Sequence, residues 1–396
     1  MATWELTGVR ERVSSIRKGK DFRSLFIYDH ELASLDLGLQ HPFKPERVLK
    51  TVELCSRYGV WEKPWMEVRG AERAEREVLE RFHQPQYLDI LERASRGEIH
   101  LETLERGLGT EDCPIVPGLY EWACRAVGGT LNGMRAILVG DVDVAFNLFG
   151  GFHHGMPDHA EGFCYLNDIA IAILEALDRG KRVAYVDIDA HHGNGVQEAF
   201  YRDPRVLVIS VHETGRTLYP WGGSEEEIGE GQGLGYNVNI PLEPGSDDEV
   251  FQLAVGSIVL PLLRAFGPDV LVAQIGADTM ISDPLTHLRL TNNSYSWALG
   301  NLASMGVPVL ALGGGGYDLY RTARCWTIAW AIFNDVEPRD ELAGLVGGMM
   351  YGPEMEVGTL MDVANPTKGE VKERAMERVT EVIDFLRRRV FPIHSL

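Results

Sequence analysis

The sequence has few basic residues and few cysteines, and both shortages exclude classes of function. Its 38 Lys and Arg stand against 58 Asp and Glu, for a net charge of −20. No basic stripe is available to neutralise phosphates, so we expect no nucleic acid as a direct partner. The five cysteines are scattered and form no C-x-x-C pair, which argues against a disulfide framework or a zinc knuckle. The acidic balance suits a basic partner, such as a cationic protein segment or a polyamine.

Long apolar stretches are also missing. No uncharged apolar run reaches the ~18 residues that a membrane span needs, so we expect no membrane partner. The first 20 residues contain no apolar segment of the kind that signal peptides carry. Cytoplasmic localisation is therefore the expectation. Oligomeric state has no signature in the sequence.

What the sequence does contain is a regular alternation of apolar β-rich runs and helical patterns. The predicted strands cover 142–149, 182–190, 205–211, 236–242, 269–275 and 307–312. The predicted helices cover 167–180, 196–203, 247–266 with a kink at Pro261, 292–305 and 320–333. Nearly unbroken apolar strands that alternate with helices predict a mainly parallel sheet with helices on both faces. The predicted fold class is therefore α/β.

No Pro-, Gly- or Ser-rich linker interrupts this alternation, so we expect one large domain over residues 1–396. Its core is predicted at about 22–335 and includes a mostly helical stretch at about 45–140. Residues 336–396 are expected to form a C-terminal extension packed on the core. The charged amphipathic segment 369–391 within it predicts a surface helix.

Polar side chains follow four of the predicted strands. The strand at 182–190 ends in DIDAHH, which contains Asp187, Asp189 and His191. Residues two apart on a strand face the same side, so these three are expected to point one way. The other strand ends carry His153-His154, Asp278 and, after four glycines, Tyr317. Ligands bind beyond the carboxyl ends of parallel strands, so all four polar clusters are expected in one crevice.

Asp189, His191 and Asp278 are the candidate metal ligands. One imidazole and two carboxylates leave a coordination position open for water or substrate, as a catalytic zinc site requires. Zn²⁺ fits this set, and Fe²⁺ or Mn²⁺ would also accept oxygen-rich ligands. Asp187 could orient a ligand or a histidine from behind. Taken alone, DIDAHH also fits an ion-paired strand end.

A divalent cation, two histidines and a tyrosine predict hydrolysis of an amide. The metal would polarise the carbonyl and activate water, and a histidine would move the proton. Tyr317 would donate a hydrogen bond to the developing oxyanion. No G-x-S-x-G motif indicates a serine nucleophile. No Lys-Ser/Thr follows the four glycines, which argues against a P-loop.

Six motifs of the chain resemble those of the zinc-dependent histone deacetylase superfamily, which has the arginase–deacetylase fold. They are HPFKPER (41–47), TEDCP (110–114), GGFHHGMPDHAEGFCYLND (150–168), YVDIDAHHGNGVQEAFY (185–201), GADTMISDPLTHLRLT (276–291) and LGGGGYDLYRTARCWT (312–327). The resemblance spans about 28–333 and is strongest to the bacterial histone-deacetylase-like and acetoin-utilisation branch. It implies removal of acetyl groups from N-ε-acetyl-lysine of proteins, with release of acetate.

The resemblance implies a role for each matching residue. The three metal candidates match the zinc ligands. His154 matches the general base and acid, assisted by His153, which is paired with Asp187. Tyr317 matches the tyrosine that polarises the acetyl carbonyl. Potassium is implied near the zinc, at Asp187, Asp189, His191, Ser210 and Val211.

The resemblance also implies a substrate tunnel. Gly162 and Phe163 match the wall that grips the lysine methylenes, and Asp112 matches the rim residue that binds the substrate backbone. Arg47 matches the arginine at the foot of an acetate-release pocket. Tyr219 stands where a second tunnel phenylalanine is usual, so the wall gains a hydroxyl.

Two further positions depart from common family patterns. Asn194 stands where many members carry an aspartate beside the second histidine, and a neutral partner should raise that histidine's pKa less. Residues 318–320 lack the arginine of eukaryotic co-repressor enzymes, which argues against inositol-phosphate-dependent co-repressor binding. We expect His192, beside the ligand His191, to be structural.

Three other functions compete with lysine deacetylation. A deacetylase of small acetylated amines, such as acetylpolyamines, would carry an acidic gatekeeper where Leu285 stands. An arginase-like enzyme with two Mn²⁺ would need a carboxylate where Gly193 stands. A catalytically silent acetyl-lysine-binding module would not need catalytic residues, but every matched catalytic position in this sequence carries one. The sequence therefore favours N-ε-acetyl-lysine as the substrate.

Overall fold

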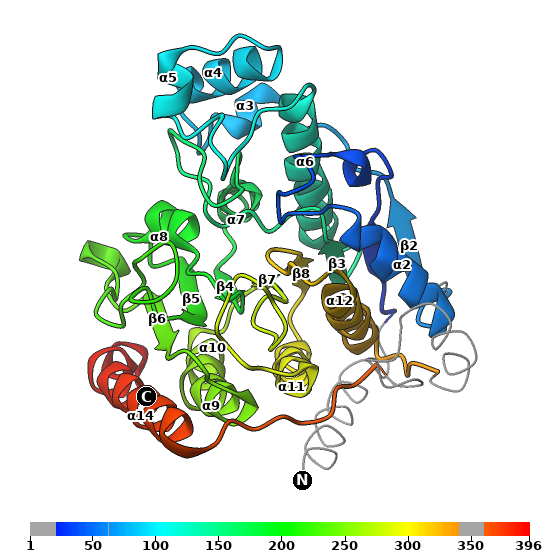
Figure 1. Ribbon diagram of the computed structural model, residues 1–396. Coiled ribbons are helices and arrows are strands. Elements are labelled where there is room, and N and C mark those ends of the chain that lie inside the picture. Colours follow the sequence, from blue (N-terminus) through cyan, green and yellow to red (C-terminus); the bar gives the residue numbers. More distant parts are fainter. Residues whose placement is uncertain (1–20, 62, 340–359) are drawn as a thin grey trace.

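One parallel sheet of eight strands forms the centre of the computed structural model, which describes residues 21–61, 63–339 and 360–396 (Figure 1). The strand order is β2-β1-β3-β8-β7-β4-β5-β6. The strands are β1 (Ser24–Ile27), β2 (Met66–Arg69), β3 (Val144–Asn147), β4 (Val183–Asp187), β5 (Val206–Glu213), β6 (Asn237–Leu242), β7 (Val270–Gln274) and β8 (Val309–Leu312). Every neighbouring pair is parallel, which confirms the predicted α/β fold class.

Helices cover both faces of this sheet (Figure 1). They are α2 (Arg47–Arg57), α3 (Arg76–Leu79), α4 (Pro85–Ser95), α5 (Leu101–Glu105), α6 (Leu119–Leu138), α7 (Asp168–Asp178), α8 (Asn194–Phe200), α9 (Asp248–Ala254), α10 (Leu260–Phe266), α11 (Asn292–Ala303), α12 (Leu319–Asn334) and α14 (Gly369–Arg389). Helices α6, α7 and α8 lie on one side, and α2, α12, α11 and α9–α10 lie on the other. All strands except β2 are buried throughout, because apolar helix faces enclose them.

Two strands of the sheet were not predicted. The four residues of β1 are too few to show a period, and β2 is an edge strand whose residues are exposed or half-buried. The stretch at about 45–140 is mostly helical, as expected, and contains one of these two strands, β2. The six predicted strands are confirmed with altered ends, and β4 stops at Asp187 rather than at 190. This shorter β4 changes the explanation of the site.

The predicted helix over 247–266 contains an irregular segment. Residues Val255–Val259 form a π-helical stretch directly before α10, in which Pro261 lies in the first turn. A proline has no N–H to donate, and widened helical turns accommodate such positions. In the described part of the chain, only Asp248–Phe266 has the length and composition of a membrane span, and 56% of its most apolar window is buried. Core helices commonly show the same pattern.

The C-terminal helix α14 packs against β6 and α9. Its buried face belongs to the same hydrophobic cluster as the strands and consists of Ala375, Val379, Val382, Ile383 and Leu386. Lys372 also pairs with Asp247 at 2.5 Å. Helix α14 therefore packs on the core through this face. Residues 1–20 and 340–359 of the predicted domain lie outside the described residues, and the division into domains stays a prediction.

The topology places the polar strand ends beside one another. Four consecutive strands of the sheet are β3, β8, β7 and β4, although they lie far apart along the sequence. Their carboxyl ends lead into the loops that carry His153-His154, Tyr317, Asp278 and Asp189. Parallel strands end at one edge, so this strand order alone gathers the four clusters into one site.

Candidate active site

Asp189 and His191 lie in the loop after β4, so strand alternation does not align them as predicted. Hydrogen bonds between residues two apart align them instead. Asp189 N donates to Asp187 Oδ1 at 3.1 Å, and His191 N donates to Asp189 Oδ1 at 2.9 Å. Each carboxylate therefore fixes the backbone of the next polar residue, and the loop turns its side chains into the site.

The three predicted metal ligands come together as one buried cluster. Ligand atoms of Asp189, His191 and Asp278 all lie within 4.8 Å of one another. Nδ1 of His191 lies 2.9 Å from Asp278 Oδ2 and 3.1 Å from Asp189 Oδ1. Donors behind them hold the carboxylates, because Gln274 Nε2 and Gly315 N both donate to Asp189 Oδ2 at 2.7 Å.

The charges of this cluster fit a divalent cation. Asp189 and Asp278 are 1% and 0% exposed, so both carboxylates lose their hydration. Burial, together with the nearby Asp189, raises the pKa of Asp278 to about 8. Burial would lower the pKa of His191, but the two carboxylates outweigh it and raise the pKa to about 10. Both buried carboxylates can be ionised together only if more positive charge lies beside them, and a bound metal ion would supply it.

His153 and His154 form a hydrogen-bonded pair beside the metal cluster. Nδ1 of His153 donates to Asp187 Oδ2 at 2.7 Å, and the Nε2 atoms of the two histidines lie 3.1 Å apart. Nδ1 of His154 lies 2.7 Å from Asn194 Oδ1. The ring centroids of His154 and His191 are 6.0 Å apart. The structure thus brings the predicted catalytic pair, its partners and the metal ligands together.

The two histidines have opposite pKa shifts. Burial lowers the pKa of His153, but the carboxylates of Asp187 and Asp189 outweigh burial and raise it overall. Burial lowers the pKa of His154 well below its usual value, and the positive charges of His153 and His191 lower it further. His153 is therefore suited to carry a proton, and His154 to stay neutral with one ring nitrogen free of a proton. Paired groups with divergent pKa values are typical of acid–base sites.

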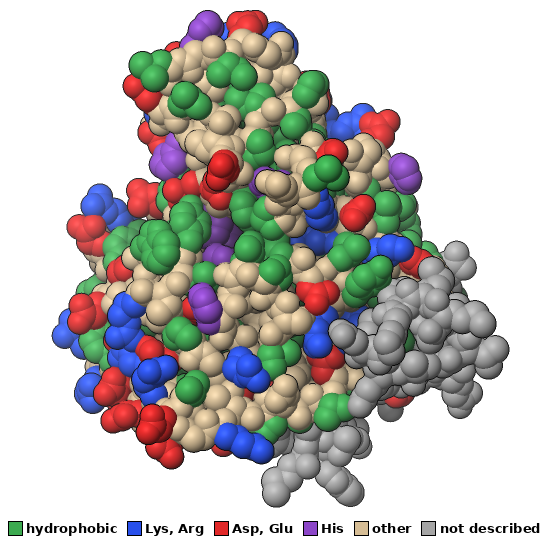
Figure 2. All heavy atoms as spheres, in the orientation of Figure 1, with side chains coloured by type: hydrophobic (Ala, Val, Ile, Leu, Met, Phe, Trp, Pro, Cys, Tyr) green, Lys and Arg blue, Asp and Glu red, His purple; other side chains and the backbone are tan. Residues whose placement is uncertain are grey.

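Aromatic side chains surround the candidate metal centre. The ring of Tyr219 lies 5.2 Å from that of His154. Tyr317 lies 5.8 Å from Phe163 and 6.4 Å from His191, in both cases edge to face. Figure 2 shows histidine side chains at the bottom of a hollow framed by hydrophobic side chains. Burial raises the pKa of Tyr317 well above its usual value, so its hydroxyl keeps a proton to donate.

Gly162 and Asp112 are joined at the predicted tunnel wall. Gly162 N donates to Asp112 Oδ2 at 2.6 Å. A Cβ on Gly162 would lie 2.2 Å from Cδ2 of His154, and its φ of +55° is the left-handed conformation that glycine tolerates. Only a glycine can approach the histidine this closely, so this wall and the base are packed as one unit.

Arg47 is buried beneath the glycine loop, as predicted for a residue below the site. Its NH1 and NH2 groups donate to the carbonyls of Gly316 and Gly314 at 2.8 and 2.5 Å. Its guanidinium lies 4.7 Å from the ring of Phe43 and 4.8 Å from that of Trp326. Its Nε is buried without a hydrogen-bond partner among the described residues. A buried cation with a free donor suits a small anion.

Three contributors to the site were not predicted, and each has a signal in the sequence. Gln274 is a polar residue at the end of an otherwise apolar strand, VLVAQ. Asp283 accepts from Tyr317 N at 2.8 Å and from Leu285 N at 3.0 Å, and so connects Leu285 to Tyr317. Glu161, within the histidine motif, accepts a hydrogen bond from Asn194 Nδ2. All three residues share one signal in the sequence: a charged or amide side chain that stands inside an apolar run or a dense motif.

The remaining predicted positions lie near the metal cluster or just outside it. Ser210 on β5 stands opposite Asp187 on β4, next to Val211. His192 lies 3.0 Å from Gln197 Oε1 and packs on His212 at 4.8 Å. Its contacts match the expectation that His192 is structural.

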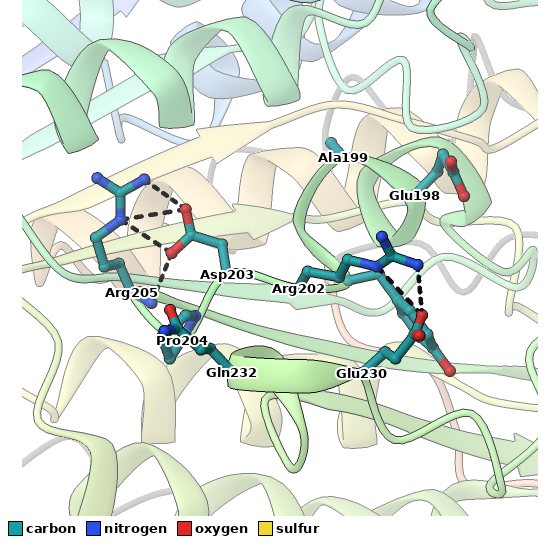
Figure 3. A pocket seen from close by; sticks show the side chains of 9 residues that line it. Glu198, Ala199, Arg202, Asp203, Pro204, Arg205, Glu230 and Gln232 are labelled. Carbon is teal, nitrogen blue, oxygen red and sulfur yellow. Dashed lines mark hydrogen bonds and ion pairs between the residues drawn. The ribbon is translucent and has the colours of Figure 1, made fainter.

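A separate surface pocket lies between α8, the start of β5 and residues 230–232 (Figure 3). Its volume is about 790 Å³. Two ion pairs line it, Arg202 with Glu230 at 2.8 Å and Arg205 with Asp203 at 2.5 Å. Both lining arginines pair with lining carboxylates, so the pocket offers no unpaired cation to an anionic ligand.

Comparisons with known proteins all point to one family. The histone deacetylase domain matches residues 41–333. Histone deacetylase B of Dictyostelium discoideum is 37% identical over 336 residues, which cover 85% of this chain and 79% of that protein. Histone deacetylase RPD3 of Saccharomyces cerevisiae is 34% identical over 338 residues, covering 85% and 77%. Histone deacetylase 1 of Homo sapiens is 34% identical over 364 residues, covering 91% and 75%.

Proposed function

Because this chain belongs to the histone deacetylase family and is a deacetylase hydrolase, we propose that it removes acetyl groups from N-ε-acetyl-lysine side chains of proteins or peptides. One observation carries the proposal most directly. A histidine pair with opposite pKa shifts lies beside a buried carboxylate–histidine cluster and a tyrosine. An amide needs activated water, a proton donor for its leaving amine and a donor to its oxyanion, and these groups supply all three functions.

Asp189, His191 and Asp278 would hold the metal, for which Zn²⁺ is proposed and Fe²⁺ or Mn²⁺ are alternatives. A divalent ion there polarises the acetyl carbonyl and lowers the pKa of water. Gln274 and Gly315 keep Asp189 oriented by donating to its Oδ2. Potassium is proposed near Asp187 and Ser210.

His154 acts as the general base in this proposal. Its Nε2 takes the proton of the attacking water and later returns it to the lysine amine. His153, held by Asp187, stays protonated beside it and stabilises the negative charge that develops. Tyr317 donates its hydroxyl proton in a hydrogen bond to the carbonyl oxygen.

The surrounding residues bind substrate and release product. Phe163 and Tyr219 would enclose the apolar lysine stem, while Asp112 at the rim accepts from the substrate backbone. Arg47 would receive acetate through its free Nε. The acidic net charge of −20 favours basic lysine-containing substrates over nucleic acid. Cytoplasmic localisation and membership of the bacterial acetoin-utilisation branch stay predictions.

The test compares substrates on purified protein with its metal content measured. A fluorogenic acetyl-lysine peptide and N-acetylated polyamines are assayed side by side. Turnover of the peptide with a higher kcat/KM supports the proposal, while turnover of the polyamines alone would replace it with the small-amine alternative. No turnover of either after metal reconstitution would indicate a binding module.

A further inference from the structure

Glu161 lies next to the proposed catalytic base without contacting it. Its backbone is held in a tight turn, because Glu161 N donates to Cys164 O at 3.3 Å and Cys164 N donates to Glu161 O at 2.9 Å. This turn contains Gly162 and Phe163, which form the tunnel wall. The side chain of Glu161 is only 25% exposed and points toward α8, where Asn194 begins the helix. Its position relative to the base is therefore fixed by the wall itself.

Asn194 connects Glu161 to His154. Asn194 Nδ2 donates to Glu161 Oε1, and Asn194 Oδ1 lies 2.7 Å from Nδ1 of His154. The other oxygen of Glu161 lies 3.5 Å from Nε2 of His159, so the carboxylate is held from both sides. These contacts form a continuous chain from the base to the rim of the tunnel.

An asparagine has one donating end and one accepting end, whereas a carboxylate only accepts. Turning the amide of Asn194 around would place Oδ1 against Glu161 Oε1, two acceptors facing each other. Glu161 therefore selects the orientation in which Oδ1 faces His154. Glutamine at position 161 would accept or donate equally well and would select neither orientation.

The orientation matters because a neutral imidazole has one N–H and one lone pair. With Oδ1 facing Nδ1, His154 carries its proton on Nδ1 and its lone pair on Nε2. This Nε2 atom lies 3.1 Å from Nε2 of His153. The reversed amide would favour a proton on Nε2, where it would block proton acceptance and oppose the Nε2–H of the protonated His153.

The geometry points to Glu161 as a positioning residue that sets the amide orientation of Asn194 and, through it, the tautomer of His154 that can act as base. This inference rests on the proposed deacetylation. It also explains how a neutral residue can serve at position 194. An aspartate there has two equivalent oxygens and needs no partner to orient it, but Asn194 does.

The experiment is a double-mutant cycle on the full chain. Glu161→Gln is made in the natural sequence and in Asn194→Asp, and both pairs are assayed on a short uncharged acetyl-lysine peptide. In the natural sequence kcat should fall roughly two- to tenfold with little change in KM, because the competent orientation is only partly populated. In Asn194→Asp the same change should leave kcat equal or raise it, because it removes repulsion between two carboxylates.

Glu230→Gln is the matched control, since Glu230 is an exposed glutamate that pairs with Arg202 outside the site. It should leave kcat unchanged, and thermal unfolding checks that all variants fold. An equal fall of kcat in both backgrounds, or no fall in the natural sequence, would overturn the positioning role.

A second measurement does not depend on activity. The ¹⁵N shifts of the His154 ring should report a proton on Nδ1 in the natural sequence and a tautomer mixture in Glu161→Gln. An unchanged His154 tautomer in Glu161→Gln would also overturn the inference. If the natural protein does not turn over acetyl-lysine, the proposed function fails, but the ¹⁵N result still decides the role of Glu161.

Discussion

The candidate active site and the surface pocket of Figure 3 are both rich in charge, but they offset it differently. In the pocket each arginine has its own carboxylate, and Arg202 and Glu230 are 75% and 60% exposed. In the active site Asp189 and Asp278 are almost fully buried, and one imidazole faces both. The pocket therefore pairs each of its arginines with a carboxylate, whereas the active site buries two carboxylates beside one imidazole.

This difference shows which feature identifies a ligand site. The pocket has a volume of about 790 Å³, yet its exposed pairs gain little from a further ion. The buried carboxylates of the active site need a counterion to be ionised together, since desolvated charge is costly without one. Four changes test this comparison, from the largest expected effect to the smallest.

Removing the metal ion, or replacing its ligand in Asp278→Asn, should have the largest effect on kcat/KM. Loss of the cation removes several kcal/mol of transition-state stabilisation, so kcat/KM should fall by at least ~10³-fold. Activity after chelation should return when Zn²⁺ is added, and Asp278→Asn should bind less metal. Asp203→Asn in the pocket is the matched control. Full activity after chelation would show that the active site does not depend on a metal ion, and its contrast with the pocket would then have no functional meaning.

Tyr317→Phe should have the next largest effect. The substitution keeps the ring that packs edge to face on Phe163 and removes only the hydroxyl. Loss of one donor to an oxyanion lowers kcat by on the order of 10²-fold, with KM nearly constant. Steady-state kinetics on an acetyl-lysine peptide measure both constants. If KM rises while kcat holds, Tyr317 binds substrate and does not stabilise the transition state.

Leu285→Glu would add a charge at the position that the family resemblance assigns to the rim of the active site, for comparison with the exposed charges of the pocket. An exposed pair contributes about 0.2–1 kcal/mol, so selectivity for acetylated polyamines over the peptide should rise by about threefold. The ratio of the two kcat/KM values measures this change. Leu285→Gln, which adds polarity without charge, is the control. An equal shift in both variants would argue against an electrostatic gatekeeper.

Arg202→Gln in the pocket should have the smallest effect. Its ion pair with Glu230 is exposed, so the free energy of unfolding should change by less than about 1 kcal/mol and kcat/KM should not change. Denaturant unfolding and the peptide assay test this together. A marked loss of activity would show that the pocket, despite its paired charges, contributes to function.

The sequence determined the α/β class, six of the eight strands and the chemical groups of the site, because apolar periodicity and dense polar motifs are local properties. The edge strands β1 and β2 have no such signal, since four residues show no period and β2 is partly exposed. Strand periodicity also gave the wrong reason for the alignment of Asp187, Asp189 and His191. The loop after β4 aligns them through side-chain hydrogen bonds to the backbone.

Only the tertiary structure decided which groups meet. The neighbours β3, β8, β7 and β4 bring residues more than a hundred positions apart to one edge, and no local pattern specifies that strand order. It also decided that Gln274 orients Asp189 and that Glu161 orients Asn194. Hydrogen-bond partners depend on distances of about 3 Å between segments far apart in the chain, and the packed fold alone sets those distances.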